Sequence, residues 1–377
     1  MTVLAVAALS ARMLAEAGRD DGLDVIALDL FGDADTRRAS SQWASIRAPA
    51  SLRIDAAMLL SALRALAQRA DVIGWIAGSG FEGEPDLLVR GAAVLPLIGT
   101  PADALRRVRD PQAFFDMLDR QGIPHPPVQM TTPVDPAGWL VKDARGCGGW
   151  HISRALPAGP APAPAPAHHY FQREVPGMPM SATFLANGDD ACVLGFNQLI
   201  VRRFGARPFV FCGAVGPVPL PPDVAQRIGA AVRMLAAEFS LRGLASLDFM
   251  LDGAAFSVLE VNPRPPASMA LYGGLGIVAA HLRASLHGEL PLSRSVSPNS
   301  CVRGTEIVFA HRATALDEPA ARRLAGLAGC HDLPFAATHF DAADPVCSVS
   351  AQGDTAAQVC ASLAQRVAAI HQFLEKL

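Results

Sequence analysis

Three oxygen-bearing side chains between residues 248 and 262 have the types and spacing of a cation site. In the segment SLDFMLDGAAFSVLEVNPRP (246–265), Glu260 and Asn262 lie two residues apart on a predicted strand, so both side chains point to the same face. Asp248 lies on the preceding strand of the predicted hairpin. Two carboxylates and an amide oxygen brought together are unfavourable without a cation, and such hard ligands suit Mg²⁺. The alternative, a hairpin with an exposed polar face, is disfavoured by the strongly apolar flanking residues.

The turn of this hairpin decides whether Asp248 joins the other two side chains. A two-residue Asp-Gly loop pairs Asp248 with Ser257 and points it away from Glu260, whereas a three-residue loop pairs it with Val258 on the shared face. Turn preference alone favours the Asp-Gly loop. A carboxylate buried without a partner is costly, however. We therefore expect an odd-residue loop or a bulge around 252–254, with Asp248 pairing near Val258.

Two basic residues are placed to meet anions near this face. Pro263 ends the strand, and Arg264 follows it, placed to contact a phosphate or carboxylate through two parallel hydrogen bonds. Only two of the 32 basic residues are lysines, Lys142 and Lys376. Lys142 lies on a predicted strand in mid-sequence, and arginine cannot always replace its compact ammonium group. We interpret Lys142 as an anion contact; a chance surface lysine is the alternative.

A glycine-rich turn follows Lys142, with glycines at Gly146, Gly148 and Gly149. Glycines at this density let successive backbone N–H groups converge on an anion and let a loop open and close. Glycine also favours a plain hairpin turn, so the turn taken alone is a weak signal.

A second glycine pattern, GSGFEG with Gly78, Gly80 and Gly83, formally matches G-x-G-x-x-G. A dinucleotide fold places this pattern after its first strand, with an acidic residue about twenty residues later. Here the pattern follows a later strand, and LPLIGTPAD supplies no such acid. We interpret it as a strand-to-helix turn that borders a cleft. An NAD-dependent oxidoreductase built on this turn is the alternative.

The elements that must position these residues fall into several patterns. The first hundred residues alternate apolar runs with helical spacing, which predicts a parallel α/β sheet with Ser10 as the cap of its first helix. Predicted strands there are 3–9, 24–30, 71–78 and 94–99, and a predicted helix is 55–68. Later predictions are an amphipathic helical region 101–120, an exposed Ala/Pro connection 155–167, a β-rich region, a long helix 221–240 and a final amphipathic helix.

Composition limits the function classes. A chain of 377 residues with 51% hydrophobic and 18% charged residues is globular and long enough for two or three domains. The formal charge of −3 argues against nucleic-acid and membrane-surface partners, and no apolar stretch is long enough to cross a bilayer. The seven cysteines are scattered and lack a C-x-x-C pair, which predicts reduced thiols and a cytoplasmic protein. Cys330 beside His331 lacks partners at metal-ligand spacing.

The order Lys142, glycine-rich turn, FQREVPGMPMS, SLDFML and LEVNPRP resembles the ATP-grasp superfamily over roughly residues 100–290. This resemblance implies a mixed α/β and α+β fold. An N-terminal parallel α/β domain (1–100) would precede a two-lobed ATP-grasp fold. Its small lobe with the glycine-rich flap would span 101–175, its large lobe with the metal site 176–290, and a C-terminal α+β extension 291–377.

The resemblance also implies roles for individual residues. Lys142 would contact the α- and β-phosphates of ATP, and the flap at Gly146, Gly148 and Gly149 would close over the triphosphate. Arg109 stands where such enzymes often carry an earlier nucleotide-facing lysine, and Arg264 would steady the transferred phosphoryl group. The hinge around the adenine would be Gln172, Arg173, Glu174 and Val175. The ligands of Mg²⁺, or alternatively Mn²⁺, would be Asp248, Glu260 and Asn262.

A narrower likeness covers nearly the whole chain. The segments ALDLFGDADTRR, GSGFEGEPDLL, PLIGT and DLPFAATHFDAADPVCSVSAQGDT are similar to ATP-grasp proteins of bacterial tetrahydromethanopterin and methanofuran C1 pathways, which resemble tyramine–glutamate ligases. This likeness implies a small-molecule carboxylate and an amine as substrates, joined through an acyl phosphate, with no catalytic Ser, Cys or His. A non-catalytic ATP-binding module is a further alternative.

Overall fold

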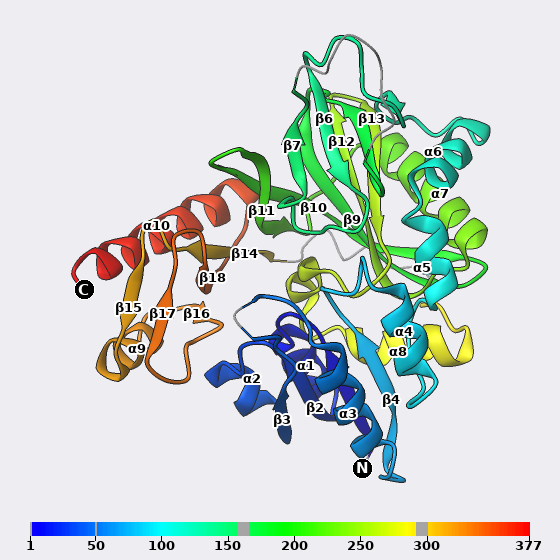
Figure 1. Ribbon diagram of the computed structural model, residues 1–377. Helices are drawn as coiled ribbons and strands as arrows, with labels where there is room; N and C mark the ends of the chain where they lie inside the picture. The colour runs from blue at the N-terminus through cyan, green and yellow to red at the C-terminus, as the bar shows by residue number, and fades with distance from the viewer. Residues whose placement is uncertain (1, 50, 157–165, 292–300) are drawn as a thin grey trace.

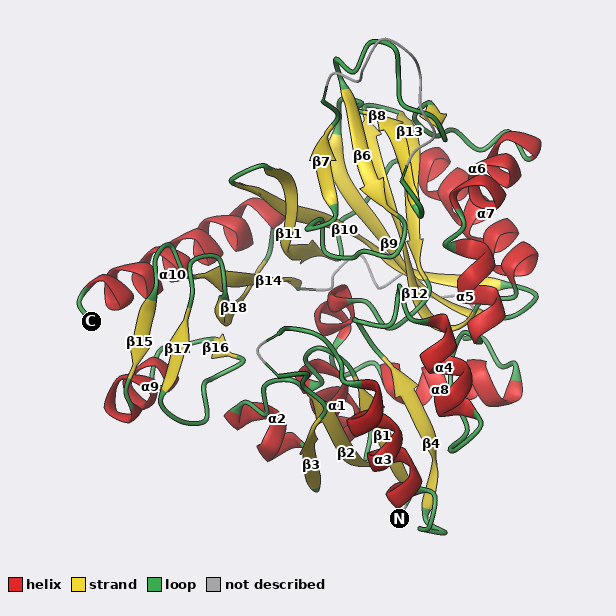
Figure 2. Ribbon diagram, in the orientation of Figure 1, coloured by secondary structure: helices red, strands yellow, loops and turns green. Residues whose placement is uncertain are grey.

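The computed structural model describes residues 2–49, 51–156, 166–291 and 301–377 (Figures 1 and 2). Its N-terminal part is a four-stranded parallel sheet in the order β3-β2-β1-β4. The strands are β1 (Val3–Ala7), β2 (Asp24–Asp29), β3 (Gln42–Ser45) and β4 (Val72–Ala77), and the helices are α1 (Arg12–Asp20), α2 (Ala34–Ala39), α3 (Ala56–Leu66) and α4 (Pro85–Ala92). Alternating side chains of β1 enter two different cores, one with α3 and α4 and one with α1. The predicted parallel α/β sheet is confirmed.

Two local predictions for this part are wrong. The expected strand at 94–99 is reduced to a single bridge between Trp75 and Leu97, next to Pro96, which has no N–H to donate to a ladder. Ser10 does not cap the first helix. The N-cap residue is Ala11, which has no side-chain cap, and its N–H donates to Asp29 Oδ2 at 3.0 Å.

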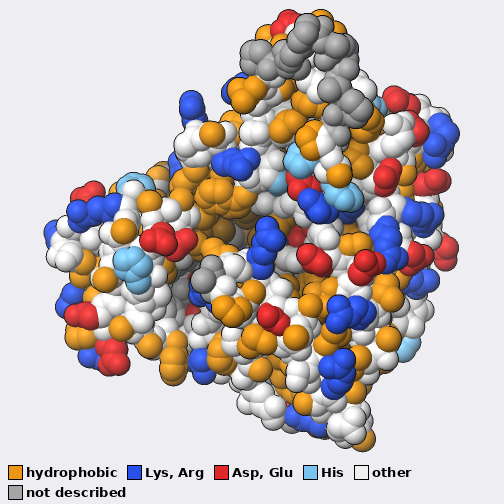
Figure 3. Space-filling model, in the orientation of Figure 1, with side chains coloured by type: hydrophobic (Ala, Val, Ile, Leu, Met, Phe, Trp, Pro, Cys, Tyr) orange, Lys and Arg blue, Asp and Glu red, His pale blue; other side chains and the backbone are white. Residues whose placement is uncertain are grey.

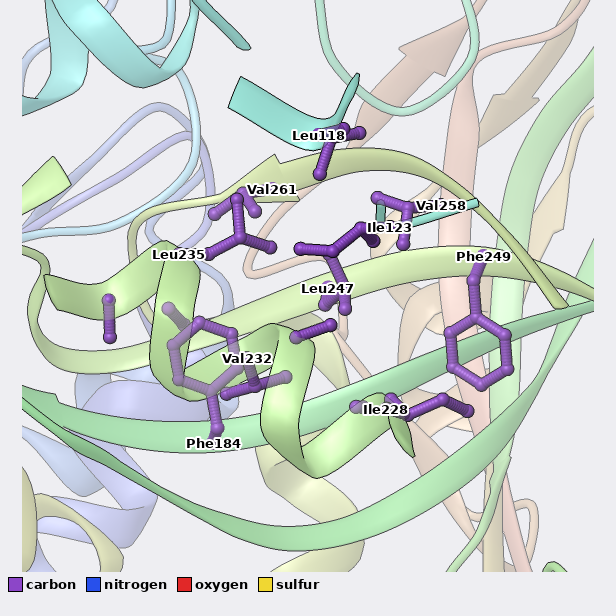
Figure 4. Close-up of a cluster of buried hydrophobic side chains, with 14 of the residues drawn as sticks. Leu118, Ile123, Phe184, Ile228, Val232, Leu235, Leu247, Phe249, Val258 and Val261 are labelled. Carbon is purple, nitrogen blue, oxygen red and sulfur yellow. The ribbon is translucent and has the colours of Figure 1, made fainter. Parts of the chain in front are cut away.

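A helical layer covers one face of the central sheet (Figures 1 and 4). The predicted amphipathic region 101–120 is split into α5 (Ala102–Val108) and α6 (Pro111–Arg120), because Asp110 caps a new helix by accepting the N–H of Ala113 at 2.8 Å. These helices and α7 (Pro222–Phe239) bury aromatic and aliphatic side chains against the sheet. Members of this core include Leu118, Phe184, Ile228, Leu235, Leu247 and Val261.

The central sheet has eight strands in the order β13-β12-β9-β10-β11-β14-β18-β16, all paired antiparallel. Five come from the middle of the chain: β9 (Met178–Asn187), β10 (Ala191–Phe204), β11 (Arg207–Gly216), β12 (Arg242–Asp252) and β13 (Ala255–Asn262). Three come from the C-terminal part: β14 (Val302–Phe309), β16 (Cys330–His331) and β18 (Pro345–Gly353). The C-terminal part therefore extends the same sheet that carries the predicted metal site.

A smaller antiparallel sheet in the order β5-β8-β6-β7 lies over the central one (Figure 2). Its strands are β5 (Val128–Gln129), β6 (Trp139–Asp143), β7 (Ile152–Arg154) and β8 (His169–Arg173). Most of the predicted Ala/Pro connection, residues 157–165, lies outside the described residues.

The remaining elements are η1 (Ala267–Tyr272), α8 (Ile277–His287), β15 (Thr314–Leu316), α9 (Glu318–Ala325), β17 (Thr338–Phe340) and α10 (Ala356–Glu375). As predicted, α10 uses one apolar face, with Val359, Leu363, Ile370 and Leu374 buried in the C-terminal core. Within the described residues, no helix is long and apolar enough to cross a membrane.

Candidate active site

The hairpin of β12 and β13 brings Asp248, Glu260 and Asn262 to one face. Its loop has two residues, 253–254, and the register that this loop sets would place Asp248 opposite Leu259. One extra residue in β13 shifts the ladder, so Asp248 pairs with Glu260 instead. Because directly paired residues share a face, the three side chains converge.

The sequence prediction was therefore right about the shared face and wrong about its cause. Val258 pairs with Phe249, not with Asp248. The predicted odd-residue loop or bulge around 252–254 is absent, and the irregularity lies beside Leu259, near the site itself. Nothing in the residue types around Leu259 signals a bulge.

The electrostatics of this face fit a cation. The Asn262 Nδ2 group donates to Asp248 Oδ2 at 3.0 Å. Burial, and then the charge of Glu260, raise the pKa of Asp248 to about 7, against the opposing effects of Arg264 and Lys142. The buried carboxylates of Asp248 and Glu260 repel each other, and a hard divalent ion between them would remove the repulsion.

Arg109, the residue that ends α5, lies behind the flap. Its Nε and Nη2 donate to the carbonyl oxygens of Ala144 and Gly146 at 2.9 and 2.6 Å, and its Nη1 lies 3.4 Å from Glu260 Oε2. Burial alone would raise the pKa of Glu260, but Arg109, followed by His151, outweighs it and the pKa is lowered. Arg109 therefore joins the glycine-rich loop to the face that carries Glu260; its direct contact with a nucleotide stays a prediction.

Lys142 extends from β6 into the same region. The residue is 3% exposed and lines the cleft. Burial lowers its pKa, while Glu260 and Asp248 act in the opposite direction. A buried lysine facing two carboxylates across a cleft is suited to contact an anion bound together with a cation.

The glycine-rich loop lies against β11. The N–H of Phe211 donates to the carbonyl oxygen of Gly148 at 3.0 Å. Gly149 has φ +78°, and a Cβ there would lie 1.8 Å from the carbonyl oxygen of Phe209. Only glycine allows this approach, so the loop packs directly against β11, where it lines the cleft.

The predicted hinge, residues 172–175, also lines the cleft. Gln172 is buried, and its Nε2 lacks a hydrogen-bond partner in the part of the chain that the structure describes. Arg173 donates to the carbonyl oxygen of Ala137 at 2.8 Å, and Glu174 pairs with Arg154 at 2.5 Å. An unpartnered amide donor in a cleft wall is suited to a ligand acceptor such as a ring nitrogen.

Sequence reasoning missed Glu82, which positions Arg264. The Arg264 Nε donates to Glu82 Oε1 at 2.7 Å, and the N–H of Gly80 donates to Glu82 Oε2 at the same distance. Burial alone would raise the pKa of Glu82, but Arg264 outweighs it and the pKa is lowered. The turn 78–83 borders the cleft, as predicted, because Gly78 lines it. The available signal was Glu82 itself, an acidic residue within the GSGFEG pattern, of which only the glycines were considered.

These residues line a cleft of about 1200 Å³, which also has walls from the N-terminal sheet and the C-terminal part. In the space-filling view the hollow opens between the C-terminal lobe and the rest of the molecule, and its inner surface is largely apolar (Figure 3). The charged residues described above occupy one end. That end can bind a polyanion together with a divalent cation.

Comparison with known proteins agrees with this geometry. Residues 108–268 match the family model described as the ATP-grasp domain. The carbamoyl phosphate synthase large chain of Thermus thermophilus is 26% identical over 234 residues, which cover 56% of this chain and 23% of that protein. The corresponding large chain of Pseudomonas syringae pv. tomato is 24% identical over 232 residues, covering 55% and 22%. The chain thus spans less than a quarter of the length of these relatives.

Solved structures show the fold over the whole chain. An L-amino acid ligase from Bacillus licheniformis has a TM-score of 0.65 at 13% identity and covers 97% of both chains. An ADP complex of N5-carboxyaminoimidazole ribonucleotide synthetase has a TM-score of 0.67 at 15% identity, covering 99% and 97%. A biotin carboxylase from Campylobacter jejuni has a TM-score of 0.68 at 12% identity, covering 95% and 89%.

The structure has the fold of these solved proteins, and residues 108–268 match the model of the ATP-grasp domain. The predicted α/β and α+β architecture is confirmed.

Proposed function

We propose that the protein is an ATP-dependent ligase that joins a carboxylate to an amine and releases ADP and phosphate. The observation that carries this proposal is the convergence of Asp248, Glu260 and Asn262 on one face of a hairpin, inside a cleft that Lys142 and Arg264 also line. This arrangement suits phosphoryl transfer, which needs charge neutralisation and alignment more than a protein nucleophile.

The residues present fit a divalent cation and a nucleotide. Asp248, Glu260 and Asn262 would hold Mg²⁺, or Mn²⁺, which supplies positive charge to phosphate oxygens. Lys142 and the N–H groups of the glycine-rich loop would donate to the phosphates. The hinge at 172–175 would bind the base, with the buried Gln172 amide as one donor.

The chemistry requires two steps. A carboxylate oxygen of the substrate attacks the terminal phosphorus of ATP, so a C–O–P linkage forms and ADP leaves. The amine then attacks the carbonyl carbon, the C–O bond breaks, phosphate leaves and the nitrogen loses a proton. Arg264, held by Glu82, would offset the negative charge on the transferred group. No serine, cysteine or histidine is assigned a covalent role.

The finer assignment is glutamate as the carboxylate, in the biosynthesis of a methanofuran-type cofactor of C1 metabolism. Its support is the likeness of segments such as ALDLFGDADTRR and GSGFEGEPDLL to proteins of those pathways. The structural similarity to an L-amino acid ligase is consistent with an amino acid as substrate. We place this activity in the cytoplasm, which the free thiol state of all seven cysteines supports.

The test is ADP release with Mg²⁺ and ATP, measured against a panel of amino acids with and without amines. We expect ADP release that requires one carboxylate and rises when an amine is added. With glutamate labelled by ¹⁸O in its carboxyl groups, one labelled oxygen should appear in the released phosphate. Amide formation without this transfer would contradict the acyl-phosphate route.

Thermal unfolding with added nucleotides, together with the ADP assay, separates the two alternatives. An NAD-dependent oxidoreductase would be stabilised thermally by NAD(H) and not by ATP with Mg²⁺. The oxidoreductase alternative depends on the turn 78–83, which already makes contacts within the protein. Its Glu82 binds Arg264, and a Cβ at Gly83 would lie 2.8 Å from Cβ of Arg145. A non-catalytic ATP-binding module would bind ATP with Mg²⁺ and release no ADP with any substrate.

A further inference from the structure

A row of polar side chains runs across the central sheet beside the proposed metal ligands. Glu260 pairs directly with Asp248, Asp248 with Ser181, and Ser181 with Asn197, on the neighbouring strands β13, β12, β9 and β10. Because directly paired residues share a face of a sheet, all four side chains lie on the face that forms the floor of the cleft. Glu260, Asp248 and Ser181 line the cleft, and Asn197 is buried beside them. The polar surface of the proposed metal site therefore continues across two further strands.

The side-chain amide of Asn197 is hydrogen-bonded on both sides. Its Nδ2 group donates to Ser181 Oγ at 3.3 Å and to Thr183 Oγ1 at 3.0 Å, and its Oδ1 accepts the Tyr272 hydroxyl group at 2.8 Å. A Cβ at Gly216 would lie 2.3 Å from Asn197 Oδ1, so the strand β11 packs closely against the amide. Because the amide oxygen faces the Tyr272 hydroxyl group, the amide nitrogen faces Ser181 and Thr183.

Tyr272 is suited to hold the amide in this orientation. It is buried at the end of η1, in the segment that follows Arg264. Burial raises the pKa of Tyr272 above its ordinary value, against the hydrogen bonds with Thr183 and Asn197 that lower it, so the hydroxyl group keeps its proton. A Cβ at Gly195 would lie 2.6 Å from the Tyr272 hydroxyl oxygen, and the missing side chain leaves room for this hydroxyl group.

These contacts fix the direction in which the Ser181 hydroxyl group can donate. A hydroxyl group has one hydrogen and two acceptor lone pairs. The Ser181 oxygen accepts from Asn197, so its own hydrogen points away from the amide. Ser181 is 2% exposed, about as deeply placed as Lys142 at 3%, and both residues line the cleft. The Ser181 hydrogen is therefore available to an acceptor in the cleft beside Asp248.

The neighbouring hydroxyl group of Thr183 differs in its surroundings. It accepts from the same amide, lies 2.7 Å from Ser268 Oγ and is fully buried. Ser181 and Thr183 thus share the Asn197 amide, but only the first is placed on the cleft floor next to Asp248.

The polar side chains at the opposite end of the cleft serve another purpose. Asp35 accepts the N–H groups of Asp332 and Leu333 at 2.8 and 2.9 Å, and Arg12 donates from Nε to Asp332 Oδ1 at 2.7 Å. Asp33, which lines the cleft there, caps α2 with its Oδ1. These groups hold the C-terminal part on the N-terminal sheet, whereas Ser181 lies beside the residues assigned to phosphoryl transfer.

We propose that the Ser181 hydroxyl group donates to the carboxylate substrate, at the oxygen that is not phosphorylated, and that Asn197 and Tyr272 position this hydroxyl group. The same oxygen becomes the carbonyl oxygen of the acyl phosphate and gains negative charge when the amine attacks. A donor that is oriented in advance stabilises that charge in the transition state. This inference rests on the proposed ligase function and names residues that position its carboxylate substrate.

The test uses the carboxylate of the panel that gives the fastest ADP release, expected to be L-glutamate, with hydroxylamine as the amine. The nitrogen of hydroxylamine attacks the acyl carbon, phosphate leaves, the nitrogen loses a proton and the hydroxamate is measured. Ser181→Ala should lower kcat by about 100-fold, the loss typical of removing one oriented donor to a developing oxyanion. The KM for ATP should stay within about threefold, because the hydroxyl group contacts the carboxylate and not the nucleotide.

Thr183→Val is the matched control. It keeps the shape of the side chain and removes a buried hydroxyl group that is bonded to the same amide. It should lower the Tm and leave kcat within about threefold of the parent. If the row served only stability, both variants would lower the Tm and both would retain kcat. A kcat of Ser181→Ala within about tenfold of the parent would overturn the inference.

Two further variants test the positioning. Tyr272→Phe removes the donor that holds the amide, so kcat should fall by about tenfold with the KM for ATP unchanged. Asn197→Asp places an acceptor beside Ser181, which would draw the hydroxyl hydrogen away from the cleft, and should lower kcat at least as much. Full kcat in folded Tyr272→Phe would overturn the positioning roles of Tyr272 and Asn197. If the parent released no ADP with any carboxylate, the proposed ligase function would fall instead.

Discussion

The two ends of the cleft each hold a buried aspartate whose pKa is raised to about 7, yet their surroundings differ. Asp248 faces a second carboxylate, Lys142 and Arg264, so its end combines several charges of both signs. Asp33 lies near Asp332 and Asp35, two acids that already have hydrogen-bond partners. The same burial effect therefore acts among charges of both signs at one end, and beside acids that already have hydrogen-bond partners at the other.

The two ends also differ in how the chain builds them. The proposed metal-binding face is local, because one hairpin supplies all three proposed ligands. The opposite end depends on contacts such as Arg12–Asp332, between residues 320 positions apart. Substitutions can therefore affect one end without the other, and the following predictions use that independence.

The largest effect is expected for Glu260→Gln. The change keeps the shape of the side chain and removes a charge from the metal-binding face, so ADP formation should fall by about 1000-fold. The protein should remain folded by circular dichroism. Turnover within tenfold of the parent would remove Glu260 from the proposed site.

Arg12→Met should have the next largest effect, on stability. Removing the guanidinium leaves Asp332 and Glu16 without their charged partner, which should lower the free energy of unfolding by about 3 kcal/mol. Thermal unfolding and limited proteolysis would detect the loosened C-terminal part. The affinity for ATP with Mg²⁺ should change little; a large loss of ATP affinity would show that the ends are coupled.

Stability should depend on pH through Asp248. Its folded pKa of about 7 lies above the value near 4 of an unfolded aspartate, so its favourable contribution is complete below about pH 4 and is lost as the pH rises to about 7. Without a divalent cation, the parent should lose on the order of 2 kcal/mol over this range relative to Asp248→Asn. Mg²⁺ should offset the loss at pH 7–8 in the parent only. Identical pH profiles for the two proteins would contradict the assigned burial of Asp248.

Lys142→Arg should reduce kcat/KM for ATP by about tenfold, because a bulky planar guanidinium replaces a compact ammonium group in a closed space. Steady-state kinetics at varied ATP would measure this. Arg106→Lys, at a residue paired with Asp86 on the exposed surface, is the control and should be neutral. Equal activity of Lys142→Arg and the parent would make the presence of this lysine a coincidence.

The smallest effect is expected at the hairpin loop. Gly253 has φ +58° with open space around its α-carbon, so Gly253→Ala should cost about 1 kcal/mol of stability through backbone strain alone. Catalysis should stay unchanged, because the bulge beside Leu259 sets the register of the proposed metal ligands. A large loss of activity would mean that the loop, rather than the bulge, controls the register.

The sequence predicted the elements of this fold well where periodicity carried the information. The parallel N-terminal strands, the long helix α7 and the apolar face of α10 all follow from the spacing of apolar residues. Ser10 failed as a helix cap because the N-cap residue is Ala11, whose N–H is bound by Asp29 from a neighbouring strand. A contact supplied from elsewhere in the fold leaves no local pattern.

The candidate site divides in the same way. Glu260 and Asn262 share a face because they are two apart on a strand, and that was readable from the sequence. The pairing of Asp248 could not be predicted from the sequence, because it depends on a bulge that has no sequence signal. Glu82 was missed because its partner, Arg264, lies 182 residues away in the sequence. Asp33 was missed because the burial of its unpartnered oxygen depends on the tertiary structure.

The most direct test of this separation is the Mg²⁺ dependence of ATP binding, measured by calorimetry for the parent, Asp248→Asn and Asp33→Asn. The two variants make the same chemical change at buried aspartates with the same raised pKa. We predict that Asp33→Asn binds ATP with the Mg²⁺ dependence of the parent and that Asp248→Asn loses most of that dependence. Loss of the dependence in Asp33→Asn, or its full retention in Asp248→Asn, would contradict the assignment of the cation and nucleotide to the hairpin end of the cleft.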